Sequence, residues 1–156
     1  MNSKGFTLME LLIVVVIIVG FAALAYPSYV SSIERARASE AVTMLGTIQA
    51  AQQKHFVNYE EYGTQFRDIN DFEPAISNFN AASNTFRTEY FVYTLNSDNA
   101  TAVRVNKGGG PVNKGYDLSV VYADNFVRCN VQNDDGEQVC SSLTDKDKSG
   151  NYYPIF

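Results

Sequence analysis

An apolar run near the N-terminus limits what this chain can fold into more than any other feature. From Phe6 to Tyr26 the residues are apolar or small, and Glu10 is the only charge among them. As an α-helix that rises about 1.5 Å per residue, this run spans roughly 32 Å, which is enough to cross the hydrocarbon core of a membrane. We therefore expect residues 6–26 to form a transmembrane segment.

Glu10 makes this segment unusual. A carboxylate in a membrane helix costs about 2.5–3.5 kcal/mol on insertion scales, so an unpaired Glu10 needs a physical reason. The residues that lead to it are Lys4-Gly5-Phe6-Thr7-Leu8-Met9-Glu10. This block resembles the prepilin signature of type IV pilins, of the type IVa kind, and of their pseudopilin relatives. In that signature a short basic leader, Gly, Phe, Thr-Leu, an apolar residue and Glu follow one another.

The resemblance implies that residues 1–5 are a leader peptide. A prepilin peptidase would cut between Gly5 and Phe6 and would also methylate the new amine of Phe6. In the family, the carboxylate at the position of Glu10 neutralises the N-terminal amine of a neighbouring subunit in the filament. Two charges that are each costly when buried alone become tolerable as a pair. The implied partners are further copies of the chain, the peptidase and the pilus assembly machinery.

Two other interpretations of the N-terminus stay open. In an ordinary secretory signal peptide, Lys4 would be a minimal basic region and 23–25 (Ala-Leu-Ala) the cleavage site. Glu10 inside the apolar region and the single Lys of the leader disfavour this interpretation. The other alternative is a plain single-pass anchor that is not processed.

The helix is predicted to continue beyond the apolar run, from residue 6 to residue 57. Its second half is amphipathic, because apolar residues recur every three or four positions. The predicted inner stripe consists of Val30, Ile33, Arg37, Ala41, Met44, Ile48, Ala51 and His55.

Two residues in the helix lower its intrinsic stability. Gly20 and Pro27 cost about 1 and 3 kcal/mol relative to Ala in a helix interior. Pro27 matches the type IVa pilin pattern, and Gly20 lies one place later than the Gly often found there. The resemblance implies that this span unwinds when the subunit enters the filament. The alternative is a kinked membrane helix without a switching role.

Residues 58–156 are expected to form a globular head. A connecting segment over 64–86 is rich in Asn, Ser, Asp and Ala, and we expect a short helix near 71–79 within it. Strands are predicted at 89–95, 101–105, 117–122 and around 126–128. The predicted class is therefore α+β: an antiparallel sheet of three or four strands packed on the amphipathic half of the long helix, as in the pilin fold.

Cys129 and Cys140 enclose ten residues that include a turn signal at 134–136 (Asp-Asp-Gly). In an exported domain this spacing favours a disulfide, which would contribute roughly 3 kcal/mol. It also resembles the C-terminal disulfide-bounded loop of many type IV pilins. Two unpaired thiols are the alternative, and a zinc site would need more ligands than these cysteines and His55 provide.

Asp145, Asp147 and Ser149 alternate before Gly150 as calcium ligands do, but no Glu follows at the twelfth position. A solvated charged turn is the favoured interpretation of this tail, and no cofactor is expected. His55 is the only histidine, so no Ser-His-Asp or Cys-His set has an independent base, and we do not expect an enzyme. The net charge is −5 without a Lys/Arg cluster, which does not favour a nucleic-acid site.

These observations predict a structural subunit of a type IV pilus. It would be held in the inner membrane before assembly and then lie in the extracellular pilus, or fimbrium, serving adhesion, twitching motility or DNA uptake. A pseudopilin of a type II secretion system is the main alternative. A monomeric exported binding module is a third hypothesis, from a different class.

Overall fold

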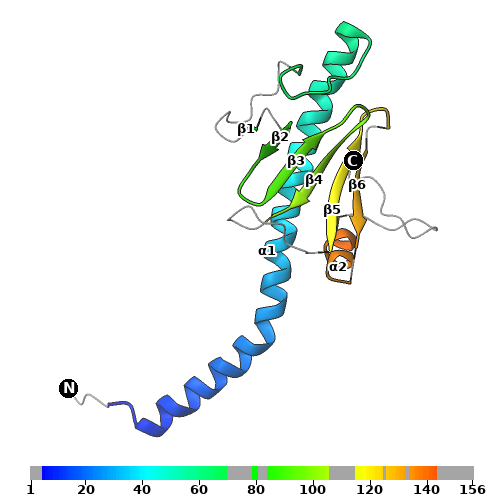
Figure 1. Cartoon of the computed structure of the whole chain (residues 1–156). Helices are drawn as coiled ribbons and strands as arrows, with labels where there is room; N and C mark the ends of the chain where they lie inside the picture. Colours follow the sequence, from blue (N-terminus) through cyan, green and yellow to red (C-terminus); the bar gives the residue numbers. More distant parts are fainter. Residues whose placement is uncertain are drawn as a thin grey trace. The chain divides into compact units, whose positions relative to one another are not determined.

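The fold is of the predicted α+β class, with one long helix followed by an antiparallel sheet (Figure 1). The structure is a computed structural model, and it describes residues 5–69, 79–80, 84–105, 115–124, 126–132 and 134–143. By its internal contacts the chain divides into two units, Met1–Glu34 and Arg35–Phe156.

Helix α1 runs without interruption from Leu8 to Tyr59, over 52 residues. It begins two residues later than predicted, because Thr7 caps it: the Thr7 hydroxyl accepts a hydrogen bond from the backbone N–H of Glu10 at 3.2 Å. It ends two residues later than predicted, where Glu60 has a φ of 60°. This left-handed conformation is the usual way to end a helix, although glycine adopts it more easily.

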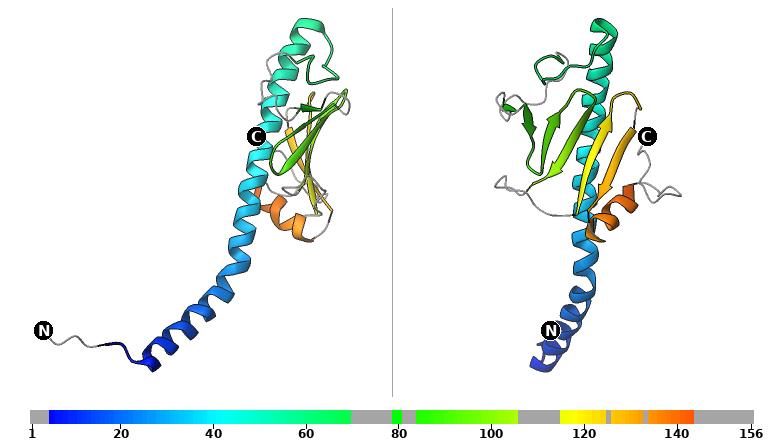
Figure 2. Two further views of the ribbon diagram at one scale, coloured as in Figure 1. Left: turned by 60° about the vertical axis from the view of Figure 1, so that its left-hand side comes forward. Right: turned by 45° about the vertical axis from the view of Figure 1, so that its right-hand side comes forward.

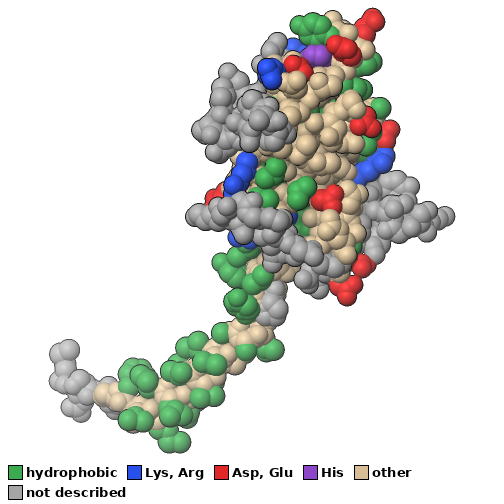
Figure 3. Space-filling view, viewed as in Figure 1, with side chains coloured by type: hydrophobic (Ala, Val, Ile, Leu, Met, Phe, Trp, Pro, Cys, Tyr) green, Lys and Arg blue, Asp and Glu red, His purple; other side chains and the backbone are tan. Residues whose placement is uncertain are grey.

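In the first unit the large apolar side chains are exposed. From Phe6 to Leu24 every large apolar side chain is exposed, by 48% at Ile13 and by up to 83% at Phe6. Figure 3 shows these side chains along the N-terminal part of the helix. Among the described residues, α1 is the one helix that is long and apolar enough to cross a membrane, with a mean hydropathy of 2.9 over its most apolar window.

The second unit contains a six-stranded sheet in which neighbouring strands follow the order of the chain and are all antiparallel. The four longer strands lie where strands were predicted. The strands are β1 (Phe79–Asn80), β2 (Thr85–Arg87), β3 (Phe91–Leu95), β4 (Asn99–Arg104), β5 (Tyr116–Val121) and β6 (Phe126–Val131).

Strands β1 and β2 correct the prediction of a plain connecting segment over 64–86. They are two and three residues long, too short to give a pattern in the sequence, and they exist because β3 offers an edge with which β2 pairs. The short helix expected near 71–79 cannot be compared over 70–78, which lie outside the described residues. At Phe79 the chain is already in β1.

One face of the sheet packs against the second half of α1, within the second unit (Figure 2). The prediction of the inner stripe is partly wrong. Ala41, Ile48 and Ala51 are buried as expected, whereas Val30 is exposed. The rest of the buried helix face, from the second unit, consists of Ala38, Val42, Leu45, Gln49 and Gln52. The predicted stripe follows one edge of this buried face. It therefore includes Arg37 and His55, which are only half-buried.

A second helix, α2 (Asp134–Leu143), follows the sheet and packs against β5 and β6. The turn predicted at 134–136 is therefore wrong. Asp134 begins the helix, where a carboxylate is favoured by the helix dipole. Gly136 allows a close approach, because a Cβ atom there would lie 1.7 Å from the carbonyl oxygen of Gly115. The residues Asp-Asp-Gly at 134–136 therefore start a helix and let it pack closely against the chain at Gly115.

Candidate functional site

The first turn of α1 presents the residues of the N-terminal motif. Glu10 lies in this turn, where its carboxylate is favoured by the positive end of the helix dipole. Its backbone is held by the Thr7 cap, and its side chain is exposed. Phe6 precedes the helix and is 83% exposed. The side chains of Phe6 and Glu10 are therefore both accessible to another chain.

The glycines of this segment are not needed for packing within the chain. A Cβ atom built at Gly5 or at Gly20 would meet no other atom within 4 Å. Pro27 lies inside α1, which continues through it. Packing among the described residues therefore does not explain a requirement for glycine at position 5 or 20.

Cys129 and Cys140 form the predicted disulfide, with 5.6 Å between their Cα atoms. The sheet register explains why they meet. Tyr93, Ala102, Leu118 and Cys129 are successive partners across β3 to β6, and all four side chains are buried on the inner face. This places Cys129 on the face of β6 that meets Cys140 of α2, and the bridge fastens α2 to the end of the sheet.

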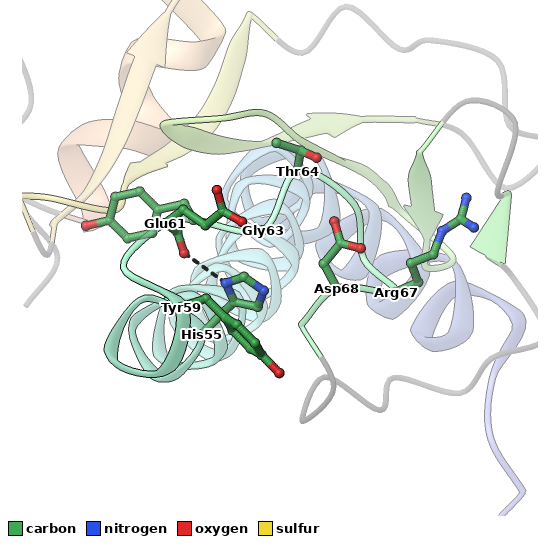
Figure 4. A pocket seen from close by; sticks show the side chains of 8 residues that line it. His55, Tyr59, Glu61, Gly63, Thr64, Arg67 and Asp68 are labelled. Atoms are coloured by element: carbon green, nitrogen blue, oxygen red, sulfur yellow. Dashed lines mark hydrogen bonds between the residues drawn. The ribbon is translucent and has the colours of Figure 1, made fainter.

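His55 lies at the far end of α1, beside a pocket of about 500 Å³ (Figure 4). Its ring atom Nδ1 is 2.8 Å from the carbonyl oxygen of Glu61. Its ring centroid is 4.6 Å from that of Tyr59. This geometry gives His55 a packing and hydrogen-bonding role.

The pocket is the feature that the sequence analysis missed. Tyr59 of α1 also lines it. Its other walls come from the segment after the helix, which the sequence showed only as a helix end and a polar connection: Glu61, Tyr62, Gly63, Thr64, Arg67 and Asp68. The segment is held in place by Gln52, which is buried in the core. The amide of Gln52 donates to the carbonyl of Gly63 at 2.7 Å and accepts from its N–H at 2.8 Å. In the sequence, the signal for an ordered segment after the helix was a glutamine, Gln52, among the apolar residues of the inner helix face.

Tyr93 of β3 and Tyr122, which follows β5, are fully buried tyrosines of the core. Burial raises the pKa of Tyr93 and of Tyr122 well above the ordinary value. Both phenols therefore stay protonated at neutral pH, and that of Tyr122 donates to the carbonyl of Asn96 at 3.2 Å. Their role is to pack the core and to fasten the β3–β4 turn.

Asp145, Asp147 and Ser149, the calcium candidates, lie outside the described residues. Within the described ranges no three His, Cys, Asp or Glu side chains are grouped so that they could hold a metal ion.

Comparison with known proteins agrees with the N-terminal geometry. The family model of the prokaryotic N-terminal methylation motif matches residues 1–26. The type IV major pilin protein PilA of Myxococcus xanthus (strain DK1622) is 38% identical over 68 residues, which are 44% of this chain and 31% of that protein.

A fimbrial protein of Neisseria meningitidis serogroup B (strain ATCC BAA-335 / MC58) is 39% identical over 60 residues, 38% of this chain and 35% of that protein. A fimbrial protein of the serogroup A strain Z2491 gives the same values. The match thus spans about a third of the length of these relatives. The methylation motif, these similarities and the helix-and-sheet fold agree with the resemblance to type IV pilins that the sequence predicts.

Proposed function

We propose that the chain is a structural subunit of a type IV pilus filament. One observation carries this proposal: the apolar first half of α1 is exposed on all sides, and it starts with the methylation motif. A helix that is apolar all round needs a membrane or other helices around it. In the filament, neighbouring copies would bury this surface, and each buried Å² contributes roughly 25 cal/mol.

The motif residues would act before and during assembly. The prepilin peptidase removes 1–5 and methylates Phe6, and Glu10 then pairs with the amine of a neighbouring copy. The accessibility of both groups supports this pairing between chains. Gly20 and Pro27 would let the helix unwind locally as the subunit leaves the membrane, since both residues weaken helical structure.

In this proposal the subunit waits in the inner membrane with its head outside, and the assembly machinery then transfers it to the extracellular pilus. Adhesion, twitching motility and DNA uptake are the uses proposed for such a filament. A pseudopilin of a type II secretion system is the second candidate, because it would share the N-terminal motif. The Cys129–Cys140 loop and the curated relatives, which are named pilin and fimbrial protein, favour the pilus.

The N-terminus of the mature protein tests the proposal most directly. Mass spectrometry of the protein purified from membranes and from sheared surface filaments should find methylated Phe6 as the first residue in both. A chain that starts at Tyr26 would indicate a secretory signal peptide, and one that starts at Met1 a plain anchor. Absence of the chain from sheared filaments of a piliated cell would favour the pseudopilin.

A substitution of Glu10 tests the pairing. Glu10→Val removes the charge that is costly in lipid, so membrane insertion should be intact or improved. Filament yield should fall sharply, because the incoming amine loses its partner. Glu10→Asp is the matched control, since it keeps the charge and should retain more filaments than Glu10→Val. Wild-type yield from Glu10→Val cells would show that the pairing is wrong.

A further inference from the structure

The pocket at the C-terminal end of α1 has no part in the proposed assembly mechanism. It lies in the second unit and has a volume of about 500 Å³. Pockets that hold small molecules typically measure roughly 300–1,000 Å³. His55 and Tyr59 line it from the helix, and Arg67 and Asp68 line it from the segment that follows (Figure 4). The chemistry of these side chains decides which class of ligand the pocket can take.

The charges in the pocket have both signs. Glu61 and Asp68 carry carboxylates, whereas Arg67 carries a guanidinium. A cation would therefore lie near the guanidinium and an anion near two carboxylates, and like charges repel at short range. The described part of the chain also has no group of three His, Cys, Asp or Glu side chains that could hold a metal ion. This lining favours an uncharged ligand over an ion of either sign.

The pocket offers hydrogen-bond donors and acceptors together. Arg67 only donates, the two carboxylates only accept, and the hydroxyl of Thr64 does both. His55 adds an acceptor. The carbonyl oxygen of Glu61, 2.8 Å from Nδ1, can only accept, so Nδ1 carries the proton and Nε2 of the neutral ring has a free lone pair. Such a mixture of donors and acceptors suits a ligand that carries several hydroxyl groups.

The main polar groups are held in place before a ligand arrives. The Oδ2 atom of Asp68 accepts from the backbone N–H of Gln65 at 2.9 Å, while Oδ1 forms no hydrogen bond with a described residue. The His55 ring is fixed by its hydrogen bond to Glu61. The whole segment is fixed by the two hydrogen bonds between Gln52 and Gly63. Groups fixed in this way lose little conformational freedom on binding, which favours affinity.

The ring of Tyr59 gives the pocket an apolar surface. Its centroid lies 4.6 Å from that of the His55 ring, and the residue is still 61% exposed. The face of an aromatic ring carries partial negative charge, so it attracts C–H groups, which are slightly positive. A ligand with C–H groups on one face and hydroxyl groups around its edge would match both parts of the lining.

We propose that this pocket binds a neutral saccharide, either a single sugar or the end of a glycan chain. Each sugar hydroxyl donates one hydrogen bond and can accept two, so it requires acceptors and donors side by side. Oδ1 of Asp68 and Nε2 of His55 accept from the sugar, and Thr64 and Arg67 donate to it. The C–H face of the sugar ring packs on Tyr59. The site belongs to the head alone and does not depend on filament assembly.

The test uses the full-length chain in dodecylphosphocholine micelles, because a detergent with a sugar head group would compete for the pocket. The methyl glycosides of glucose, galactose, mannose and N-acetylglucosamine are each titrated up to about 100 mM, a limit that still detects weak binding. At least one of them should shift the backbone amide NMR signals of 61–68 with a saturable midpoint. N-acetylneuraminic acid, which carries a carboxylate, should bind at least tenfold more weakly than the best neutral glycoside.

Two variants and a control locate the binding. Asp68→Asn keeps an oxygen for the N–H of Gln65 but replaces the free acceptor with a donor, so it should raise the midpoint about fivefold or more. Tyr59→Ala removes the apolar surface and should also raise the midpoint. Asp98→Asn changes a carboxylate at the β3–β4 turn, outside the pocket, and should leave the midpoint unchanged. The amide spectrum without sugar shows whether each variant is folded.

Three results would overturn the proposal. The first is the absence of a saturable shift at 61–68 with all four neutral glycosides. The second is an unchanged midpoint in both Asp68→Asn and Tyr59→Ala, since the sugar would then bind elsewhere. The third is a preference for N-acetylneuraminic acid, because the pocket would then select a charged ligand.

Discussion

The two halves of α1 differ in what surrounds their apolar side chains. Leu12, in the first half, is 56% exposed, whereas Leu45, in the second half, is fully buried against the sheet. The first half is apolar on all sides, and the second half is apolar along one face only. The fold of the single chain therefore accounts for the apolar face of the second half. The large apolar side chains of the first half stay exposed, and the proposed function places them against a membrane or other subunits.

The residue sizes follow the same division. The second half presents Ala38, Ala41 and Ala51 among its buried residues, and these small side chains let the sheet lie close to the helix. The first half presents mainly Leu, Ile and Val, which are large and suited to contact with lipid or with other helices. The following substitutions test whether the two halves are as independent as this division implies.

The largest effect is expected at Gly5. Under the proposed processing, Gly5→Val should leave the precursor uncut in the membrane and should abolish filaments, because the prepilin peptidase would have to fit closely to the backbone beside Phe6. The fold should not change, since a side chain at Gly5 meets no atom within 4 Å. Immunoblotting for precursor length and electron microscopy for filaments measure the result, with Ser3→Val as the control in the leader. Mature protein of normal length from Gly5→Val would contradict the prediction.

Leu45→Ala and Leu12→Ala compare the two halves directly. Leu45→Ala should lower the free energy of unfolding of the head by about 2–5 kcal/mol, because it leaves a cavity in the core. Leu12→Ala should leave head stability unchanged, since Leu12 is 56% exposed and is not one of the buried core residues. Thermal denaturation of the chain in micelles, followed by near-ultraviolet circular dichroism, measures both. An equal loss in the two variants would mean that the halves are not independent.

Removal of the disulfide should affect the head alone. The double variant Cys129→Ser/Cys140→Ser should lose about 3 kcal/mol of stability, because the unfolded chain regains the freedom of an open loop. The expected fall in melting temperature is roughly 10 °C. A reducing agent should have a similar effect on the wild type and no further effect on the double variant. A melting temperature that does not change would show that packing of α2 alone holds this end of the sheet.

The smallest effects on stability are expected from substitutions of two glycines, Gly136 and Gly20. Gly136→Ala should lower head stability by about 1–3 kcal/mol, because its Cβ would overlap the carbonyl of Gly115 and push α2 from the sheet. Gly20→Ala meets open space and should instead favour the helix by about 1 kcal/mol without changing the head. Denaturant titration in micelles distinguishes the two. A stable Gly136→Ala variant would mean that α2 can shift without loss of packing.

The sequence predicted elements that have a long, repeated pattern, and it failed where the pattern was short. The alternation in β3, β4 and β5 located those strands to within a few residues. β2 has three residues and depends on its pairing with β3, so no local pattern could reveal it. At Asp134 the local pattern was misleading, because Asp-Asp-Gly suits a turn as well as the start of a helix.

The candidate sites divide in the same way. Gly5, Phe6 and Glu10 could be named from the sequence, because their spacing along one short segment is the signal. The pocket could not, since His55 comes to lie beside the carbonyl of Glu61 only after the chain turns back at Glu60. Such contacts depend on the residue at which the chain reverses direction. The sequence does not identify that residue, because several residue types allow a reversal.

The sequence by itself determined that residues 6–26 can form a helix of membrane length, that the second half of the long helix has one buried face, and that strands follow. Side-chain periodicity and length are local properties, so they can be read without the fold. Only the tertiary structure decided which residues of α1 face the sheet, that Cys129 points toward α2, and that a pocket forms beside His55. These outcomes depend on register and packing between segments distant in sequence, where a shift of one residue turns a side chain to the opposite face.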